Sequence, residues 1–294
     1  MTKWRPTERL SPVLRAMLWA IATGVFFTVL NVILRKLSQE MSPYEVQFLR
    51  YLVGLAVMMP WILASGFAAF RPNGLGGQLT RGIVHTVGLA TWYTALPHLP
   101  LADSTAISFT IPIFAMIGAA WFLGERMVLA RWIAAIIGLA GVVILLAPKL
   151  TGSGGIYNLV MIASQPLFAA SLLITKVLTR RDRAEVIVVW QAITISLFTL
   201  PIALIDWSWP SLPQYGWFVL AAMLGNAGQY CSARSLMAAD VSATQSVRFL
   251  ELLWAAGLGI LVFGDPLHQS TIIGGLVILA ATVWISRREA RSPG

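Results

Sequence analysis

Apolar residues along the chain fall into long runs that are separated by short polar segments rich in proline and glycine. A helix needs about 20 apolar residues to cross the roughly 30 Å hydrocarbon layer of a bilayer. Runs of about this length recur throughout the chain, and they predict ten membrane-spanning helices, at 12–34, 44–64, 79–96, 101–123, 129–147, 156–178, 185–205, 213–237, 241–263 and 270–285. The pattern therefore predicts an all-α integral membrane protein.

The second half of the chain repeats the design of the first half about 140 residues later. The fourth predicted span ends in the elbow GER at 124–126, and the ninth ends in the elbow GDP at 264–266. Each half holds five predicted spans, an odd number, so the second half enters the membrane from the opposite side. We predict two inverted repeats, at 12–148 and 155–286, an arrangement that in transporters places the substrate site near the bilayer midplane.

Composition and charge agree with a membrane protein. Hydrophobic residues make up 57% of the chain and charged residues 11%, whereas soluble domains have about 25% charged residues. If the N-terminus is cytoplasmic, most Lys and Arg residues lie on that side of the membrane, and Arg35, Lys36 and Lys149 lie on the other. This asymmetry predicts a multi-pass protein of the cell inner membrane with both termini in the cytoplasm.

Several other classes of function are not supported. The single Cys231 and three scattered His residues spell out no disulfide, metal site or cofactor site. We find no nucleotide-binding loop or catalytic triad, and the basic residues form no stripe interleaved with aromatic residues. The chain is therefore not expected to be an enzyme or to bind nucleic acid. Its expected partners are a small-molecule substrate and the lipid bilayer, with the chain as a monomer or homodimer.

Two stretches carry a resemblance to a known family. The elbow GER follows PLADSTAISFTIPIF at 100–114 and precedes an apolar run with Gly138 and Gly141, and the unit returns with GDP. This combination resembles the EamA-type domain of the drug/metabolite transporter superfamily. The resemblance implies a ten-helix basket whose central cavity is lined mainly by the first, third, fourth, sixth, eighth and ninth spans. It also implies transport of small organic metabolites by alternating access, with export favoured.

The ninth predicted span carries two ionisable residues, which are costly inside a membrane and usually face a cavity or a partner. Arg248 and Glu251 lie on one helical face, with Gln245 one turn earlier. One interpretation is a structural ion pair. In the other, Arg248 holds a substrate carboxylate and Glu251 holds an ammonium group or carries a proton.

The second interpretation predicts a secondary active or facilitative transporter of polar or zwitterionic, amino-acid-like metabolites. The alternative is a carrier of larger aromatic or nucleoside-like compounds, such as riboflavin or S-adenosylmethionine, or of drugs. A structural or channel-like membrane protein is the alternative outside transport.

Further candidates for substrate binding are polar and aromatic side chains inside predicted spans. Each has a structural alternative, since small hydroxyls allow close helix packing, amides can bond to one another, and a lone His is often a packing residue. These candidates are Trp19, Asn31, His85, Trp92, Tyr93, Ser104, Ser108, Gln165, Asn226, Gln229, Tyr230 and Trp254. Pro112 predicts a kink in the fourth span near Ser108.

Three other charged residues are given structural roles. Arg50 lies ten residues before Pro60, as Gln191 lies ten before Pro201, and we expect its side chain to snorkel to the interface or to pair with a loop acid. Glu125 and Asp265 in the two elbows are expected to cap the helix that follows each of them.

Overall fold

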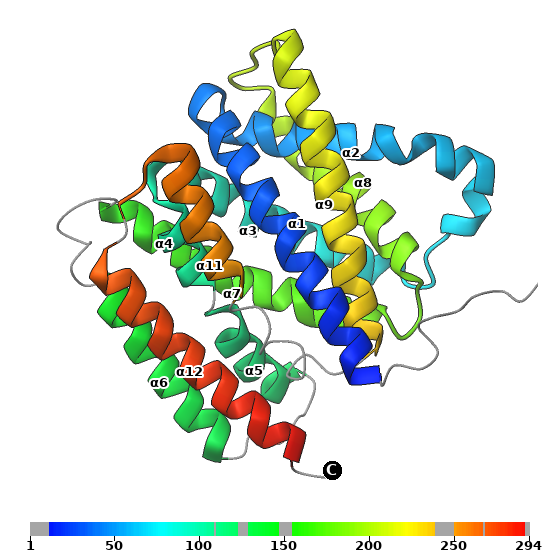
Figure 1. The fold of residues 1–294 in the computed structure, drawn as a ribbon. Coiled ribbons are helices and arrows are strands. Elements are labelled where there is room, and N and C mark those ends of the chain that lie inside the picture. Colours follow the sequence, from blue (N-terminus) through cyan, green and yellow to red (C-terminus); the bar gives the residue numbers. More distant parts are fainter. Residues whose placement is uncertain are drawn as a thin grey trace, which may run out of the picture.

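The computed structural model describes residues 12–108, 110–122, 129–146, 155–238, 250–266 and 268–291. Within these ranges the secondary structure is helical, and Figure 1 shows the arrangement. The helices are α1 (Pro12–Glu40), α2 (Pro43–Ser65), η2 (Phe67–Phe70), α3 (Leu75–Ala95), η3 (Leu96–His98), α4 (Leu101–Ser108), α5 (Ile111–Phe122), α6 (Leu129–Leu146), α7 (Gly155–Leu178), α8 (Ala184–Ala203), α9 (Leu212–Ala238), α11 (Leu250–Leu258), the π-helix η5 (Gly259–Phe263) and α12 (Gln269–Arg291).

The fourth predicted span is broken rather than kinked. The helix α4 ends at Ser108 and α5 begins at Ile111, so Pro112 is the second residue of α5. A proline is tolerated there because the first turn of a helix has no acceptor for its N–H. The hydroxyl groups of Ser108 and Thr110 donate to backbone carbonyls of α4, at 2.9 and 2.8 Å. The carbonyl of Ile107 also accepts the backbone N–H of Thr110, at 3.0 Å.

The helices of the two halves pack against one another in matched pairs (Figure 1). The first helix of each half packs on the third helix of the other half, as α1 on α9 and α7 on α3. In the same way, the second helix of each half packs on the third helix of the other half, as α2 on α9 and α8 on α3. Equivalent helices of the two halves also pack on each other, in the pairs α2 with α8, α4 with α11 and α6 with α12. An exchange of partners of this kind is what a two-fold relation between the halves requires.

The pair α6 and α12 depends on close backbone approach. A Cβ atom added at Gly141 of α6 would lie 2.9 Å from the carbonyl oxygen of Gly274 and 3.0 Å from the backbone nitrogen of Ile278, both on α12. These backbone atoms cannot move aside without separating the helices.

We therefore expect Gly141→Ala to lower the free energy of unfolding by about 1–3 kcal/mol, the usual cost of overpacking. Unfolding of the purified protein in detergent by titration with sodium dodecyl sulfate measures this difference. The matched control is Gly257→Ala in α11, where an added Cβ would meet no atom within 4 Å. Equal stability of the two variants would contradict the prediction.

The surface of the described helices is suited to lipid. By length and composition, α1, α2, α7 and α8 contain stretches that can cross a membrane. Large apolar side chains such as Leu63, Trp121, Ile136 and Leu261 are exposed on the outside of the molecule. Exposure to water of so many apolar side chains would be unfavourable. The all-α membrane class predicted from the sequence is confirmed, and the number of ten spans stays a prediction.

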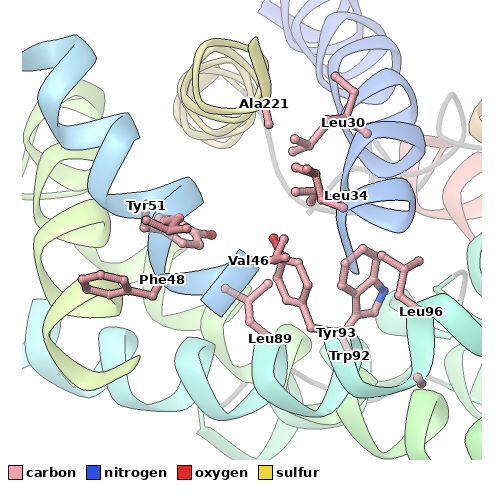
Figure 2. Packing of buried hydrophobic residues seen from close by; sticks show 14 of the residues in the cluster. Leu30, Leu34, Val46, Phe48, Tyr51, Leu89, Trp92, Tyr93, Leu96 and Ala221 are labelled. Atoms are coloured by element: carbon pink, nitrogen blue, oxygen red, sulfur yellow. The ribbon is translucent and has the colours of Figure 1, made fainter. Parts of the chain in front are cut away.

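The main apolar core lies between α1, α2, α3 and α9 (Figure 2). Leu30 and Leu34 of α1 face Leu89 and Tyr93 of α3, with Val46 of α2 between them. All five side chains are buried. Four of them, all but Val46, also line the cavity described next, so the core holds one wall of the cavity in place.

Candidate functional site

A cavity with a volume of about 230 Å³ lies among the helices of both halves. Its lining comes from α1, α3, α4, α7, α9 and α11, which correspond to the six spans that the family resemblance implies, and also from Ile111 at the start of α5. Residues of α2 take part as well, through Arg50 and Tyr51. The cavity is therefore built from helices of both halves rather than from one half.

Aromatic rings from four helices form much of the lining. They are Phe27 of α1, Tyr51 of α2, Trp92 and Tyr93 of α3, and Phe168 of α7. The rings of Trp92 and Tyr93 meet edge to face, with centroids 5.1 Å apart, and Figure 2 shows both rising from α3. Rings in fixed orientations offer flat apolar surfaces against which a planar molecule can stack.

Arg81 of α3 links three helices at one wall of the cavity. Its Nε donates to Oγ1 of Thr175 on α7 at 2.6 Å, and its Nη2 donates to Oε1 of Gln191 on α8 at 2.9 Å. Its Nη1 donates to the carbonyl of Ile187 at 3.4 Å. The guanidinium group is buried, with 4% of the residue exposed. The fork of donors on one arginine thus fixes the relative positions of α3, α7 and α8.

Arg50 of α2 is the second buried cation of the cavity, and its surroundings differ. Its guanidinium carbon lies 3.9 Å from the centroid of the Tyr51 ring, and its Nη2 occupies the place that a Cβ atom at Gly225 of α9 would take. Its Nε is buried and has no hydrogen-bond partner among the described residues. The expectation that Arg50 reaches the interface is corrected, because 4% of the residue is exposed and it lines the cavity.

His85 and Glu251 also line the cavity. Nδ1 of His85 lies 2.9 Å from the hydroxyl oxygen of Ser171 on α7, and the His85 ring packs on Phe168. Glu251 on α11 is 9% exposed and packs against α1, where a Cβ atom at Gly24 would lie 2.8 Å from its Cγ. The cavity lining therefore includes an acidic side chain and an imidazole as well as two arginines.

The structure brings about half of the predicted site residues to the cavity. Those that line it are Asn31, His85, Trp92, Tyr93, Ser108, Gln229 and Glu251. Arg248 and Gln245 lie outside the described residues, so the predicted pairing of Arg248 with Glu251 is not visible.

The other predicted residues lie away from the cavity lining and have structural contacts. Ser104 donates to the carbonyl of Leu101 within α4. The amide of Asn226 donates to the carbonyl of Gly54, and the amide of Gln165 donates to the carbonyl of Met161. The ring of Trp19 packs on that of Tyr230, with centroids 6.0 Å apart. Trp254 is 53% exposed on the outer surface.

Neither Arg50 nor Arg81 was predicted from the sequence to be a substrate-binding residue. The predicted third span, 79–96, places Arg81 at its cytoplasmic end and among the cytoplasmic charges. The helix α3 begins at Leu75 instead, which places Arg81 nearly two turns inside it. Arg50 was recognised as an ionisable residue inside a span, a signal that by itself points to a functional site.

The elbow residue Asp265 holds three segments together at one end of the molecule. Its Oδ2 accepts a hydrogen bond from Nη1 of Arg35 at 2.5 Å and from the backbone N–H of Leu101 at 2.9 Å. The Arg35 guanidinium also lies over the ring of Phe263, 4.3 Å from its centroid. We expected Asp265 to cap the helix that follows it. Asp265 instead accepts the N–H of Leu101, the first residue of α4. Glu125 lies outside the described residues.

Comparison with known proteins gives consistent matches over nearly the whole chain. The model of the EamA-like transporter family matches residues 14–147 and again residues 155–287. A riboflavin transporter of Rhizobium johnstonii is 31% identical over 277 residues, which cover 93% of this chain and 91% of that protein. An S-adenosylmethionine uptake transporter of Rickettsia prowazekii is 26% identical over 288 residues, 97% of each chain.

Two further matches extend this comparison. A pseudopaline exporter of Pseudomonas aeruginosa is 24% identical over 274 residues, 93% of this chain and 96% of that protein. A solved crystal structure shares the fold with a TM-score of 0.69 at 17% identity, over 94% of this chain and 99% of its own. Together with the helical cavity, the two family matches establish that this chain belongs to the EamA-like transporter family and is a membrane transporter rather than an enzyme.

Proposed function

We propose that this transporter carries a small polar metabolite with a planar aromatic ring system. The observation that carries the proposal is the set of aromatic rings that four helices contribute to one cavity. Trp92 and Tyr93 supply two rings at nearly right angles, 88° apart, so a flat substrate can stack on one ring and contact the edge of the other. Relatives named for riboflavin and S-adenosylmethionine support this substrate class.

A second candidate is an amino-acid-like zwitterion, the first substrate predicted from the sequence. What favours it is the presence of Glu251 and the cations Arg50 and Arg81 in the same cavity lining. A carboxylate on the protein suits an ammonium group, and a guanidinium suits a carboxylate. The two candidates differ in whether the ring or the charged groups of the substrate dominate recognition.

The transport mechanism that we propose is alternating access between two five-helix repeats, at 12–148 and 155–286. The exchange of packing partners between the halves supports it, as does the contact of Asp265 with Arg35 and Leu101, which joins the two halves at one end. With both termini in the cytoplasm of a cell with an inner membrane, this contact lies on the periplasmic side. Rocking of the halves about the central cavity then requires the contact to break in each cycle.

Flux through purified protein in proteoliposomes tests the proposal. Labelled riboflavin, S-adenosylmethionine, tryptophan and alanine are offered in both directions, with and without a pH gradient. We expect saturable flux for one or more of the compounds with an aromatic ring, with competition among them. Transport of alanine but not of the ring compounds would favour the second candidate, and non-saturable flux would contradict alternating access.

The aromatic wall gives a sharper prediction for a single residue. Trp92→Ala is expected to weaken the apparent affinity for the transported ring compound by about threefold to tenfold, through loss of a stacking surface. Concentration dependence of the initial flux measures this effect. Trp254→Ala removes the same side chain at a position that is 53% exposed and outside the cavity lining, and it is expected to leave the affinity unchanged. An unchanged affinity in Trp92→Ala would count against stacking.

A further inference from the structure

Two buried arginines line the cavity, but their donors are used differently. All three nitrogens of the Arg81 guanidinium have protein acceptors, on Thr175, Gln191 and Ile187. Among the described residues, Arg50 has a ring contact with Tyr51 and no hydrogen bond or carboxylate partner. Arg50 is nevertheless as deeply buried as Arg81, with 4% of each residue exposed.

The difference between the two arginines follows from the difference between the two halves. Gln191 of α8 stands where Arg50 stands in α2, each ten residues before a proline. Gln191 accepts a hydrogen bond from Arg81 of the facing helix α3. On the other side, the facing helix α9 presents Gly225, which brings no side chain to Arg50. Arg81 therefore has a side-chain acceptor on the helix that faces it, and Arg50 has none on α9.

A buried cation without an acceptor is costly, since removal from water is not offset by a partner. An anion entering the cavity supplies that partner and finds up to five N–H donors in a fork that matches a carboxylate or phosphate. The guanidinium fills the space that a side chain at Gly225 would take, and no acceptor on α9 stands there. Gln229, one turn later on α9, lines the same cavity and adds an amide donor near this position.

We propose that Arg50 is the anion subsite of the transporter, which binds a carboxylate or phosphate group attached to the substrate. The inference rests on the proposed function, because the aromatic wall receives the ring and Arg50 receives the acidic group of the same molecule. It names a chemical class within the proposed substrates: aromatic metabolites that carry an acidic group. Arg81 has a structural role beside this subsite, since each of its three guanidinium nitrogens donates to a protein acceptor.

Matched pairs of ligands with and without an acidic group test the subsite. The pairs are riboflavin with riboflavin 5′-phosphate, and nicotinamide with nicotinate, and binding to the purified protein in detergent is measured by calorimetry. We expect the acidic member of at least one pair to bind about 10-fold to 100-fold more tightly than the neutral member, the range for a charge-assisted hydrogen bond. The phosphate and carboxylate pairs distinguish the two kinds of acidic group.

Variants at the subsite locate the preference. In Arg50→Gln we expect the acidic and neutral members to bind equally, whereas Arg50→Lys retains part of the preference. Gly225→Ala keeps the arginine but displaces its guanidinium, and it is expected to reduce the preference as well. Arg183→Gln, at a side chain that is 73% exposed, is the control for loss of a positive charge.

The outcomes separate this inference from the function on which it rests. Binding of neutral ring compounds without a preference for the acidic members overturns the anion subsite and leaves the proposed function standing. A preference that survives in both Arg50→Gln and Gly225→Ala also overturns it. If no member of either pair binds, and no ring compound is carried by the wild-type protein, the proposed function fails and the subsite fails with it.

Discussion

Replacing Asp265 with alanine is expected to lower the free energy of unfolding by about 3–5 kcal/mol, the usual cost of removing one partner of a buried ion pair. Arg35 and Asp265 each have 9% of their side chain exposed. Without the carboxylate, Arg35 keeps its charge in a poorly solvated position, and the N–H of Leu101 loses its acceptor. Unfolding in detergent, by heat or by titration with sodium dodecyl sulfate, measures the loss.

The neighbouring variants give the prediction its controls. Asp265→Asn keeps an oxygen for the N–H of Leu101 and is expected to cost less than alanine. The double change Arg35→Leu with Asp265→Leu removes both charges and is expected to recover much of the stability, because no unpaired charge remains. If Asp265→Ala unfolds like the wild type, the contact is not a significant part of the fold.

Replacing Arg81 with methionine is expected to lower the free energy of unfolding by about 2–5 kcal/mol. Thr175 and Gln191 would each lose a hydrogen bond from a charged donor in a buried position, and an unsatisfied buried group costs about 1–3 kcal/mol. Methionine fills a similar volume, so the loss reports on the hydrogen bonds rather than on a cavity. The same detergent unfolding experiment measures the change.

This second prediction also has a charge control. Arg81→Lys keeps the positive charge but cannot reproduce the planar fork of donors. We expect lysine to restore less than half of the unfolding free energy that Arg81→Met loses. Arg180→Met changes an exposed arginine in the turn that follows α7 and is expected to have little effect. Equal stability of Arg81→Met and Arg180→Met would show that α3, α7 and α8 do not depend on Arg81 for their packing.

The spacing of apolar and polar residues was sufficient to predict the class of the protein. Membrane spans are local features, because each depends on the length of an apolar run rather than on distant contacts. The elbows at 124–126 and 264–266 were likewise local, and they led to the transporter family that the comparisons confirm. The amino-acid-like substrate was not confirmed, since the named relatives carry riboflavin, S-adenosylmethionine and pseudopaline.

The site was predicted less well, for a geometric reason. A span end that is uncertain by a few residues changes the depth of a charged side chain, and Arg81, predicted at the end of the third span, lies nearly two turns inside α3. A polar residue inside a span can face either the cavity or a neighbouring helix, and the sequence pattern does not distinguish the two. Asn226 and Gln229 are one turn apart on α9, yet Asn226 bonds to α2 and Gln229 lines the cavity.

The sequence by itself determined that this chain is an all-α membrane transporter built from repeated units, because hydrophobic length and motif spacing are properties of the chain alone. The tertiary structure decided which of its charges are paired and which face the cavity. Arg35 meets Asp265 across 230 positions, and Arg50 meets a glycine of α9 where Arg81 meets a glutamine of α8. These pairings depend on how far each helix is rotated about its axis and how deep it lies in the membrane. Helix packing determines both, and the periodicity of the sequence does not.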